Sequence, residues 1–173
     1  MINIKIKEVS EILNAECKGY CDQDIDIKGV SIDSRNVITN SLFIPIKGLT
    51  VNGHSFIKDA VKNGAIATLW NKDEPNPPDN IAVILVDDTV KGLQDLSRYY
   101  RNKLKTKIVG VTGSNGKTST KDITAAVLSQ KYKTQKTIGN FNTEIGVPYT
   151  LLSLDEDCQV AVIEMGMERK GEI

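Results

Sequence analysis

Hydrophobic and polar residues alternate along the first half of the chain, a pattern that is typical of half-buried β-strands. The pattern predicts five short strands, over 2–6, 25–32, 41–46, 65–69 and 81–86. Two helices are predicted between them, over 9–13 and 55–62. The second ends at Asn63 and Gly64, because glycine tolerates the left-handed conformation of a helix cap. With an exposed, proline-rich loop over 71–80, this half is predicted to be a small α/β domain.

The second half has a helical spacing followed by apolar runs. Residues 89–104 carry apolar side chains at helical intervals after two aspartates, which predicts an amphipathic helix able to connect two domains. Beyond it the expected order is strand, glycine-rich loop, helix, strand, loop and strand; the regular elements cover 107–111, 118–130, 134–137 and 160–163. The continuous apolar run of the last strand is typical of a parallel sheet that is covered on both faces.

These patterns predict an α/β protein with two parts. We expect a small α/β domain over 1–87, a linker helix over 88–106, and the start of a doubly wound, parallel-sheet domain over 107–173. The second sheet is expected to be incomplete, since few strands remain to close it, and the chain is therefore interpreted as part of a longer protein.

Composition narrows the class of protein. The 173 residues contain 22 Lys plus Arg and 22 Asp plus Glu, so the net charge is zero, and the basic excess typical of nucleic-acid binders is missing. We expect no nucleic-acid partner, no membrane insertion and no signal peptide, and a monomer in the cytoplasm. The three cysteines are expected to be reduced thiols, and the spacing of Cys17 and Cys21 without a nearby histidine does not favour a zinc site.

The main chemical signal is a glycine-rich loop between a predicted strand and a predicted helix. Gly113 and Gly116 allow the backbone to curl so that its N–H groups converge on a phosphate, and the helix adds the positive end of its dipole. Lys117 supplies a positive charge to the β- and γ-phosphates, and the Thr118 hydroxyl is placed to bind Mg²⁺. The common motif has its first glycine where this chain has Val111, so a chance glycine turn before a helix is the alternative.

The motif TGSNGKTS at 112–119 resembles the short phosphate loop of the Mur ligase family. SIDSR at 31–35, LFIPIKG at 42–48 and NGHSF at 52–56 resemble the UDP-sugar-binding domain of these ligases. GNFNTEIGVP at 139–148 and EMGMERKGEI at 164–173 resemble the members that add D-alanyl-D-alanine. The resemblance covers nearly the whole chain.

The resemblance implies an activity in the synthesis of peptidoglycan precursors, and hence in cell-wall biogenesis, cell shape and cell division. ATP phosphorylates the terminal carboxylate of UDP-N-acetylmuramoyl-tripeptide, and the amine of D-alanyl-D-alanine attacks the acyl phosphate. Mg²⁺ and a lysine offset the negative charge of the phosphates. The resemblance also implies a modified lysine further along the central domain and a C-terminal domain that closes over ATP, so that these 173 residues alone are expected to be inactive.

The expected ATP site follows from the loop and from the resemblance. Lys117 is the expected catalytic residue, Thr118 and Glu164 are the expected Mg²⁺ ligands, and Glu164 follows a predicted parallel strand at the end where α/β sheets bind ligands. The alternative for Glu164 is a solvated acid. The residues expected to contact ATP are Gly113, Ser114, Asn115, Gly116, Lys117, Thr118, Ser119, Asn140, Asn142 and Thr143. Turn formation is the alternative role of the last three.

A second group of residues is expected to hold the UDP-sugar substrate: Ser34, Arg35, Lys47, Gly48 and His54. The fork of an arginine suits the geometry of a diphosphate. A turn residue and a surface ion pair are the alternative roles of Ser34 and Arg35. His54 is the only histidine, which favours a hydrogen bond to substrate or backbone over a metal.

Three other functions compete with this interpretation. One is another ligase of the same family, and one is an unrelated P-loop protein such as a small kinase or GTPase. A GTPase should have an NKxD-type stretch after the loop, whereas Asn71-Lys72-Asp73 precedes it. The third is a UDP-sugar-binding module without enzymatic activity.

Overall fold

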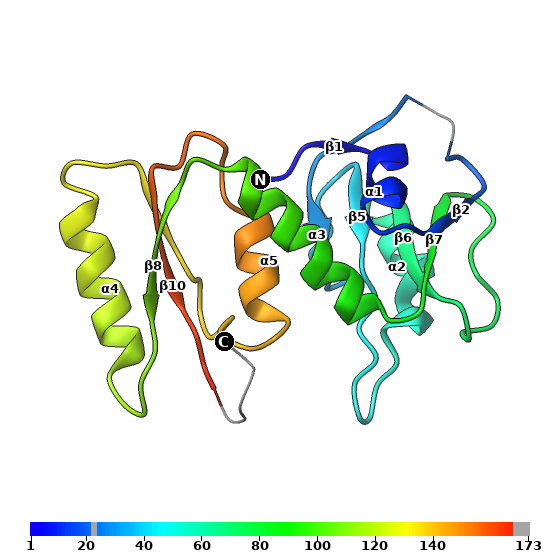
Figure 1. The fold of residues 1–173 in the computed structure, drawn as a ribbon. Coiled ribbons are helices and arrows are strands. Elements are labelled where there is room, and N and C mark those ends of the chain that lie inside the picture. Colours follow the sequence, from blue (N-terminus) through cyan, green and yellow to red (C-terminus); the bar gives the residue numbers. More distant parts are fainter. Residues whose placement is uncertain (22–23, 168–173) are drawn as a thin grey trace. The chain divides into compact units, whose positions relative to one another are not determined.

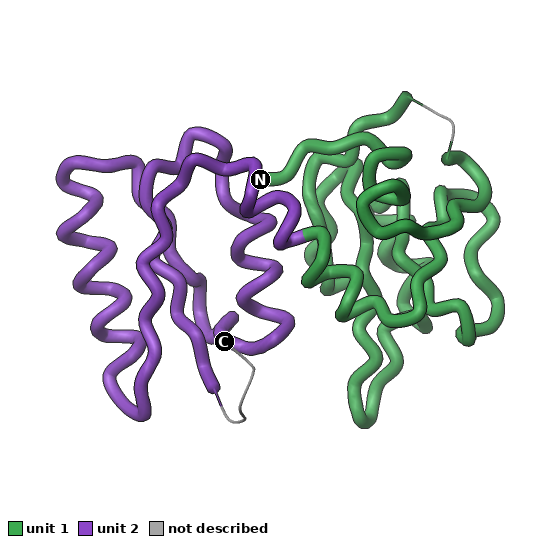
Figure 2. The backbone as a smooth tube through the Cα atoms, viewed as in Figure 1, with its two compact units in different colours: residues 1–96 green, residues 97–173 purple. Residues whose placement is uncertain are grey.

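The chain forms two compact units, Met1–Leu96 and Ser97–Ile173 (Figure 2). The structure, a computed structural model, describes residues 1–21 and 24–167. The boundary between the units falls within α3 (Thr89–Lys103), the helix that was expected to connect two domains. Both units combine helices with parallel strands, which confirms the predicted α/β class.

Unit 1 is built on a five-stranded sheet (Figure 1). Across the sheet the strands lie in the order β2 (Glu16–Lys18), β7 (Ala82–Val86), β6 (Ala65–Asn71), β5 (Ser41–Phe43) and β4 (Val30–Ser31). All neighbours are parallel except β2, which is antiparallel to β7. A separate antiparallel pair joins β1 (Ile4–Lys5) to β3 (Asp26–Ile27), and the helices are α1 (Ile6–Ile12), a 3₁₀ turn (Gly53–Phe56) and α2 (Ile57–Lys62).

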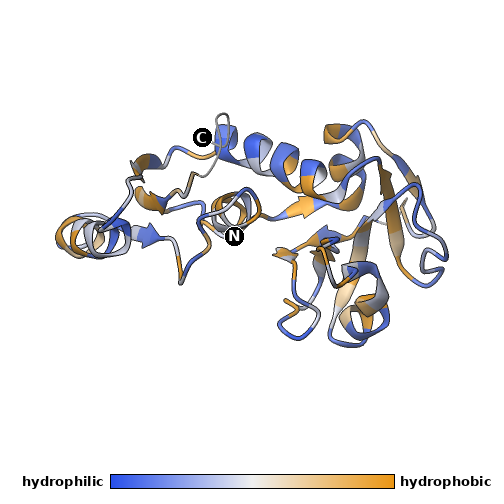
Figure 3. Ribbon diagram, turned by 90° about the horizontal axis from the view of Figure 1, so that it is seen from below, coloured by the Kyte–Doolittle hydropathy of each residue, from blue (hydrophilic) through white to orange (hydrophobic). Residues whose placement is uncertain are grey.

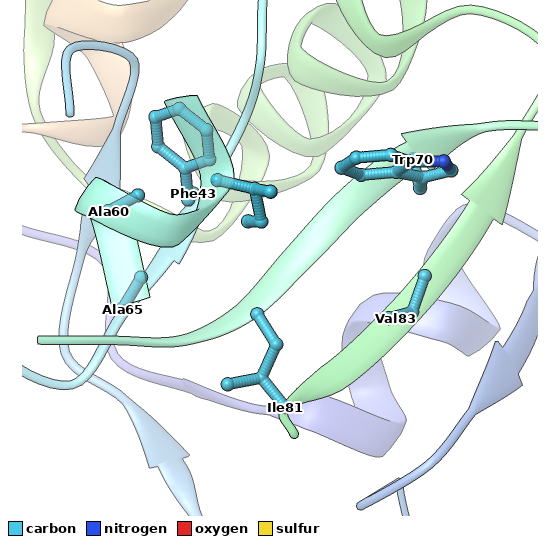
Figure 4. Close-up of a cluster of buried hydrophobic side chains, with 7 residues drawn as sticks. Phe43, Ala60, Ala65, Trp70, Ile81 and Val83 are labelled. Atoms are coloured by element: carbon cyan, nitrogen blue, oxygen red, sulfur yellow. The ribbon is translucent and has the colours of Figure 1, made fainter. Parts of the chain in front are cut away.

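One cluster of apolar side chains joins α2 to the sheet of unit 1 (Figure 4). Its buried members are Phe43, Ile57, Ala60, Ala65, Trp70, Ile81 and Val83. Burying side chains of this kind is the main stabilising contribution in a small domain. The cluster fixes β5, β6 and β7, and the segment after β5 carries the predicted substrate residues Lys47, Gly48 and His54.

The structure differs from the predicted pattern at two strands of unit 1. The first alternating segment is a strand only at Ile4–Lys5, because Ile6 already begins α1. The second segment is divided between β3 and β4 at Gly29, which has a φ of +146°. The division arises because β3 pairs with β1 while β4 pairs with β5, so the chain passes from one sheet to another at this glycine.

The expectation of three free thiols was wrong. Cys17 on β2 and Cys21 in the turn after it are joined by a disulfide, with their Cα atoms 6.0 Å apart, and only Cys158 is a free, buried cysteine among the described residues. The short strand β2 was not predicted, and without it the chain offered no reason to bring two cysteines four positions apart face to face.

Unit 2 has a three-stranded parallel sheet between two helices (Figure 1). The central strand is β10 (Val160–Glu164), with β8 (Lys107–Val111) on one side and β9 (Thr134–Lys136) on the other. Helices α4 (Lys117–Leu128) and α5 (Gly146–Leu152) lie on opposite faces of this sheet. The carboxyl ends of all three strands therefore lie at one edge, where ligands bind to open α/β sheets.

Helix α5 was missed by the pattern of apolar residues. It is seven residues long and begins at Gly146, whose backbone N–H donates to Thr143 Oγ1 at 3.3 Å. Pro148 lies in its first turn, where the missing N–H of proline is tolerated. A side chain at Gly146 would meet the Phe141 backbone at 2.4 Å, so this glycine permits a close approach of the preceding loop. The threonine and the proline are the signals that could have predicted this helix.

The amphipathic character expected of α3 is present. Figure 3 shows hydrophilic and hydrophobic residues alternating along this helix, and its buried side chains include Leu93, Leu96 and Tyr100. Among the helices of the described residues, none combines the length and apolar character needed to cross a membrane.

Candidate functional site

The phosphate loop connects β8 to α4 in unit 2. Gly116 immediately precedes α4 with a φ of +76°, and Gly113 has a φ of +149°, so both positions use backbone conformations that favour glycine. No atom lies within 4 Å of the position that a side chain at Gly116 would take, so this side of the loop is open. The first N–H groups of a helix have no carbonyl partner within it, and they are available to an anion at this position.

Lys117 is the first residue of α4 and is half-buried. Its Nζ donates to the Gly113 carbonyl oxygen at 2.7 Å, so the side chain folds back over the loop. A lysine in this position can exchange a carbonyl oxygen for phosphate oxygens with a small movement of its flexible stem. Ser114, Asn115 and Ser119, the other polar residues of the loop, are exposed.

Glu164, at the carboxyl end of β10, lies beside the first turn of α4. Its Oε1 accepts hydrogen bonds from Asn142 Nδ2 at 2.9 Å and from Thr118 Oγ1 at 3.3 Å, while the residue is only 2% exposed. The Glu164 N–H donates to Thr137 Oγ1 at 2.9 Å, which fixes the backbone that carries the carboxylate. The first turn of α4, the loop after β9 and the end of β10 thus bring together three residues that the sequence had placed in one site.

The carboxyl group of Glu164 is held in its charged form. Burial by itself raises the pKa of a carboxyl group, but the hydrogen bonds from Asn142 and Thr118 and the charge of Lys121 outweigh it, and the pKa of Glu164 lies below its ordinary value. A buried carboxylate that stays ionised is suited to bind a cation.

The second oxygen of this carboxylate forms an ion pair but no hydrogen bond. Glu164 Oε2 is buried and has no hydrogen-bond partner, and a buried polar atom in this state is unusual in a folded protein. An oxygen of a single carboxylate, with the neighbouring Thr118 hydroxyl, fits Mg²⁺, which binds proteins through one or two carboxylates and completes its shell with phosphate oxygens and water. Within residues 1–21 and 24–167 no cluster of three or more His, Cys, Asp or Glu is placed to hold a metal ion.

Sequence reasoning missed one residue of this site, Lys121. Its side chain is 3% exposed, and its Nζ lies 3.5 Å from Glu164 Oε2. The signal was its position on α4, four residues after Lys117 and four before the buried Ala125, which places it on the face of the helix that covers the sheet. A lysine on the buried face of a helix indicates a charge partner on the facing strand.

Two other residues expected to contact ATP have structural partners. The Asn140 carbonyl oxygen accepts from Asn142 N at 2.7 Å in an exposed turn, and Thr143 Oγ1 accepts from the first residue of α5. Asn142, by contrast, directs its amide to Glu164 and accepts from Gly166 N at 2.7 Å through its carbonyl. The end of the motif 164–173, residues 168–173, lies outside the described residues.

In unit 1, Arg35 and Ser34 belong to the turn after β4. The guanidinium of Arg35 makes a two-point contact with the Asp33 carboxylate, from Nε to Oδ1 at 2.9 Å and from a terminal nitrogen to Oδ2 at 2.7 Å. This contact and a bond from the Arg35 N–H hold the pKa of Asp33 below its ordinary value. The Arg35 side chain is 85% exposed. Ser34 is buried, and its carbonyl accepts from Asn63 Nδ2 at 2.7 Å.

The remaining substrate candidates belong to the loop after β5. Lys47 is exposed, with its Nζ 3.5 Å from Glu74 Oε2, and Gly48 N donates to the Val51 carbonyl. His54 is buried, and its ring contacts Trp70 edge to face with centroids 4.6 Å apart. Its Nδ1 lies 2.8 Å from Asn52 Oδ1, and its Nε2 accepts from a backbone N–H at 3.4 Å, so both ring nitrogens are engaged inside the unit.

Two models of Mur ligase domains match the chain, each over a different part. A model of the Mur ligase middle domain matches residues 111–172, and a model of the Mur ligase family catalytic domain matches residues 26–101.

Curated relatives match over the full chain. A UDP-N-acetylmuramoyl-tripeptide–D-alanyl-D-alanine ligase of Bacillus subtilis is 47% identical over 173 residues, which is 100% of this chain and 38% of that protein. The ligase of the same name from Escherichia coli is 38% identical over 174 residues, or 37% of its length. The chain thus spans little more than a third of the length of the relatives that it matches.

Solved structures of Mur ligases have a fold similar to that of this chain. A crystal structure of MurF from Acinetobacter baumannii has a TM-score of 0.86 and 31% identity, and the match covers 99% of this chain and 38% of that one. The MurF ligase of Thermotoga maritima, solved in complex with ADP, has a TM-score of 0.72 and 35% identity, covering 84% of this chain and 33% of that one.

Proposed function

The chain belongs to the Mur ligase family, and from this premise we propose that it supplies the ATP-binding loop and the UDP-sugar-binding domain of a ligase that adds D-alanyl-D-alanine to UDP-N-acetylmuramoyl-tripeptide. In this proposal residues 1–87 bind the UDP-sugar, 88–106 connect the two parts, and 107–173 begin the ATP-binding domain. The name shared by the B. subtilis and E. coli relatives supports the choice of substrates. The reaction would take place in the cytoplasm, with the protein as a monomer.

One observation carries the ATP half of the proposal. The buried carboxylate of Glu164 has one oxygen that is bonded to Asn142 and Thr118 and one that has no hydrogen-bond partner, directly beside the helix that follows the phosphate loop. A carboxylate that served only the fold would be expected to have both oxygens bonded. The ADP complex of the T. maritima MurF supports a nucleotide as the ligand of the loop.

The residues have distinct roles in this proposal. Gly113–Ser119 hold the β- and γ-phosphates with backbone N–H groups, and Lys117 turns from Gly113 to the phosphate oxygens. Thr118 Oγ1 and Glu164 Oε2 would hold Mg²⁺, which supplies charge neutralisation when bound. Asn142 keeps the carboxylate aimed at the loop, while Asn140 and Thr143 shape the turn that carries Asn142.

The chemistry explains why a carboxylate-activating enzyme needs such a loop. A carboxylate is a poor electrophile, because its negative charge repels an amine and it has no good leaving group. Transfer of the γ-phosphoryl group to the substrate carboxylate gives an acyl phosphate, and attack by the amine of D-alanyl-D-alanine then forms the amide and releases phosphate. Positive groups around the phosphates stabilise the charge that develops in the first step.

In unit 1 the exposed Arg35 and Lys47 are the charged groups proposed to meet the diphosphate of the UDP-sugar, with Ser34 and Gly48 shaping their turns. Each pairs with a carboxylate of its own unit, and an exposed ion pair of this kind is weak enough to exchange for a phosphate. His54 is proposed to support the loop rather than to touch the ligand, since its ring nitrogens are already engaged.

The ATP assignment is tested by measuring nucleotide affinity with and without Mg²⁺. We expect MgCl₂ to tighten binding of ADP to the wild-type chain, and Glu164→Gln to remove this effect while binding without Mg²⁺ changes little. Glu156→Gln, which alters an exposed carboxylate of the same unit, is the control and should keep the full Mg²⁺ effect. Equal Mg²⁺ dependence in the wild type and Glu164→Gln would remove Glu164 from the metal site.

We also expect the chain to bind its ligands without completing the reaction, since it spans 38% of the B. subtilis relative. Incubation with both substrates and ATP should release no phosphate above background. Formation of the amide product by these 173 residues would refute this expectation.

A further inference from the structure

The pair Lys121–Glu164 joins α4 to β10 inside unit 2. The side chains of both residues are 3% exposed, and Nζ lies 3.5 Å from Oε2. Among the described residues a second carboxylate near Nζ is that of Asp122, at 3.7 Å, whose side chain is 47% exposed and bonded to Lys136 at 2.7 Å. Lys121 is therefore the cation that faces the otherwise unbonded oxygen of Glu164.

The Lys121–Glu164 pair lies beside the phosphate loop, which relates it to the proposed metal site. Lys121 follows Thr118 by one helical turn on α4, and both side chains approach the same carboxylate, Thr118 at Oε1 and Lys121 at Oε2. Nζ and Oε2 lie 3.5 Å apart, so their ion pair compensates the charge of the carboxylate but is longer than a usual charge-assisted hydrogen bond. The oxygen therefore remains able to accept another ligand.

We propose that Lys121 is a positioning residue that takes the place of the metal cation at Glu164, balancing the buried carboxylate until Mg²⁺ arrives and keeping the affinity for free Mg²⁺ low. This inference rests on the proposed assignment of Glu164 to Mg²⁺. A buried carboxylate without a counter-charge strongly destabilises the fold. The metal-free site therefore needs a positively charged side chain beside the carboxylate. The same ammonium group repels an incoming cation, and the negative phosphates of the nucleotide offset that repulsion.

The consequence is an order of binding. Free Mg²⁺ binds weakly to the chain alone, whereas Mg²⁺ that arrives with the nucleotide meets the phosphates, Thr118 and Glu164 together. A purely structural ion pair between α4 and β10 would stabilise the fold to the same extent but would leave the response to Mg²⁺ unchanged when the lysine is replaced.

The test uses Lys121→Met, which keeps a stem of similar length and removes the charge. Thermal unfolding is followed without nucleotide in a titration with MgCl₂. We expect this variant to be less stable than the wild type in EDTA, and to gain stability at Mg²⁺ concentrations roughly tenfold lower, because one unit charge has been removed next to the site. Lys121→Arg, which retains the charge, should keep the weak response of the wild type.

Lys136→Met is the matched control, because it removes a lysine that pairs with Asp122 in the same unit without facing Glu164. It should respond to Mg²⁺ as the wild type does. A folded Lys121→Met chain with the wild-type response would overturn the proposal, since the charge would then have no effect on the metal.

If Lys121→Met does not fold even with Mg²⁺, the double variant Lys121→Met, Glu164→Gln decides the question. Recovery of folding without any response to Mg²⁺ supports charge compensation, whereas a double variant that also fails to fold assigns Lys121 to packing alone and contradicts the proposal. The Mg²⁺ dependence of ADP binding by the wild type and Glu164→Gln separately tests the metal assignment, so failure of that assignment is distinguished from failure of the role of Lys121.

Discussion

The two units treat their polar candidate residues in opposite ways. In unit 1 the charged and polar groups are paired within the unit: Arg35 with Asp33, Lys47 with Glu74, and His54 with Asn52 and Asn71. In unit 2 one oxygen of the buried Glu164 carboxylate has an ion pair with Lys121 but no hydrogen bond, beside a glycine-rich loop whose helix end is open. Because Glu164 Oε2 lacks a hydrogen bond, we regard unit 2 as the stronger candidate for a ligand site.

The difference also separates two kinds of binding surface. The ion pairs of unit 1 that involve Arg35 and Lys47 are exposed and can exchange partners with a ligand at little cost. Glu164 is buried, and hydrogen bonds with Asn142, Thr118 and Thr137 hold its carboxylate and backbone in place. We therefore expect substitutions in unit 2 to have larger effects on binding than substitutions in unit 1.

The largest effect is expected for Lys117→Ala. The variant should bind ATP about 100-fold more weakly, because it loses charge-assisted hydrogen bonds to the phosphates. The thermal unfolding midpoint should not change, since the hydrogen bond of the side chain to Gly113 lies on the surface loop. Calorimetric titration with ATP measures the affinity, and Lys107→Ala, an exposed lysine on β8, is the control. In the full-length enzyme the same substitution should abolish turnover, and unchanged activity would remove Lys117 from the mechanism.

A smaller effect is expected for Arg35→Ala in unit 1. The variant should bind UDP-N-acetylmuramoyl-tripeptide about tenfold more weakly while ATP affinity is unchanged, because one exposed guanidinium is lost and other contacts remain. Titration of the variant with each ligand separates the two affinities, and Lys58→Ala on α2 serves as the exposed control. Wild-type affinity for the UDP-sugar would assign Arg35 to its turn alone.

The stability of unit 1 should depend on pH through His54. Burial lowers the pKa of this histidine, with a smaller lowering contribution from Lys47, so the unfolded chain binds the proton more readily than the folded chain. The stabilising contribution is therefore complete above the ordinary value of about 6.5 and is lost as the pH falls through the lower folded value. Trp70, the only tryptophan, contacts His54 and reports unfolding of this unit by fluorescence. His54→Phe should flatten the pH dependence, and an unchanged pH profile would contradict the role of burial.

The smallest effect is expected at Tyr100 in unit 2. Its hydroxyl donates to the Leu154 carbonyl at 2.9 Å in a buried position, and Tyr100→Phe should cost about 1 kcal/mol of unfolding free energy. Burial and the nearby carboxylates raise the pKa of Tyr100 to about 12, so its contribution is complete below the ordinary value near 10 and is lost as the pH rises through about 12. Urea unfolding at rising pH should show this loss in the wild type but not in the variant.

Much of the fold followed from local patterns. The amphipathic α3 and the strands β8 and β10 have bounds close to those predicted, because a helical or apolar run bounded by turn residues has few alternatives. Helix α5 was not predicted, since it is only seven residues long and begins at a glycine that lies close to the loop at Phe141. The strand β2 and its disulfide depend on pairing with β7, which is distant along the chain.

The same distinction applies to the site. The place of the glycine-rich loop between β8 and α4, and of Glu164 at the end of β10, could be predicted, because a motif and the end of a parallel strand each specify a position. The contact of Asn142 with Glu164 depends on how the loop after β9 packs against the end of β10, which no local pattern encodes, whereas the burial of Lys121 could have been inferred from its spacing on α4. The engagement of His54 within its own unit likewise depends on distant residues of β6.

We propose that one chain carries two separate sites, one for ATP and one for a UDP-sugar. Calorimetric titration of Mg²⁺ and ATP into the chain saturated with UDP-N-acetylmuramoyl-tripeptide distinguishes two sites from one. We expect one ATP to bind to each chain while the UDP-sugar remains bound. Displacement of the UDP-sugar by ATP, or a preference for GTP without any UDP-sugar binding, would contradict it.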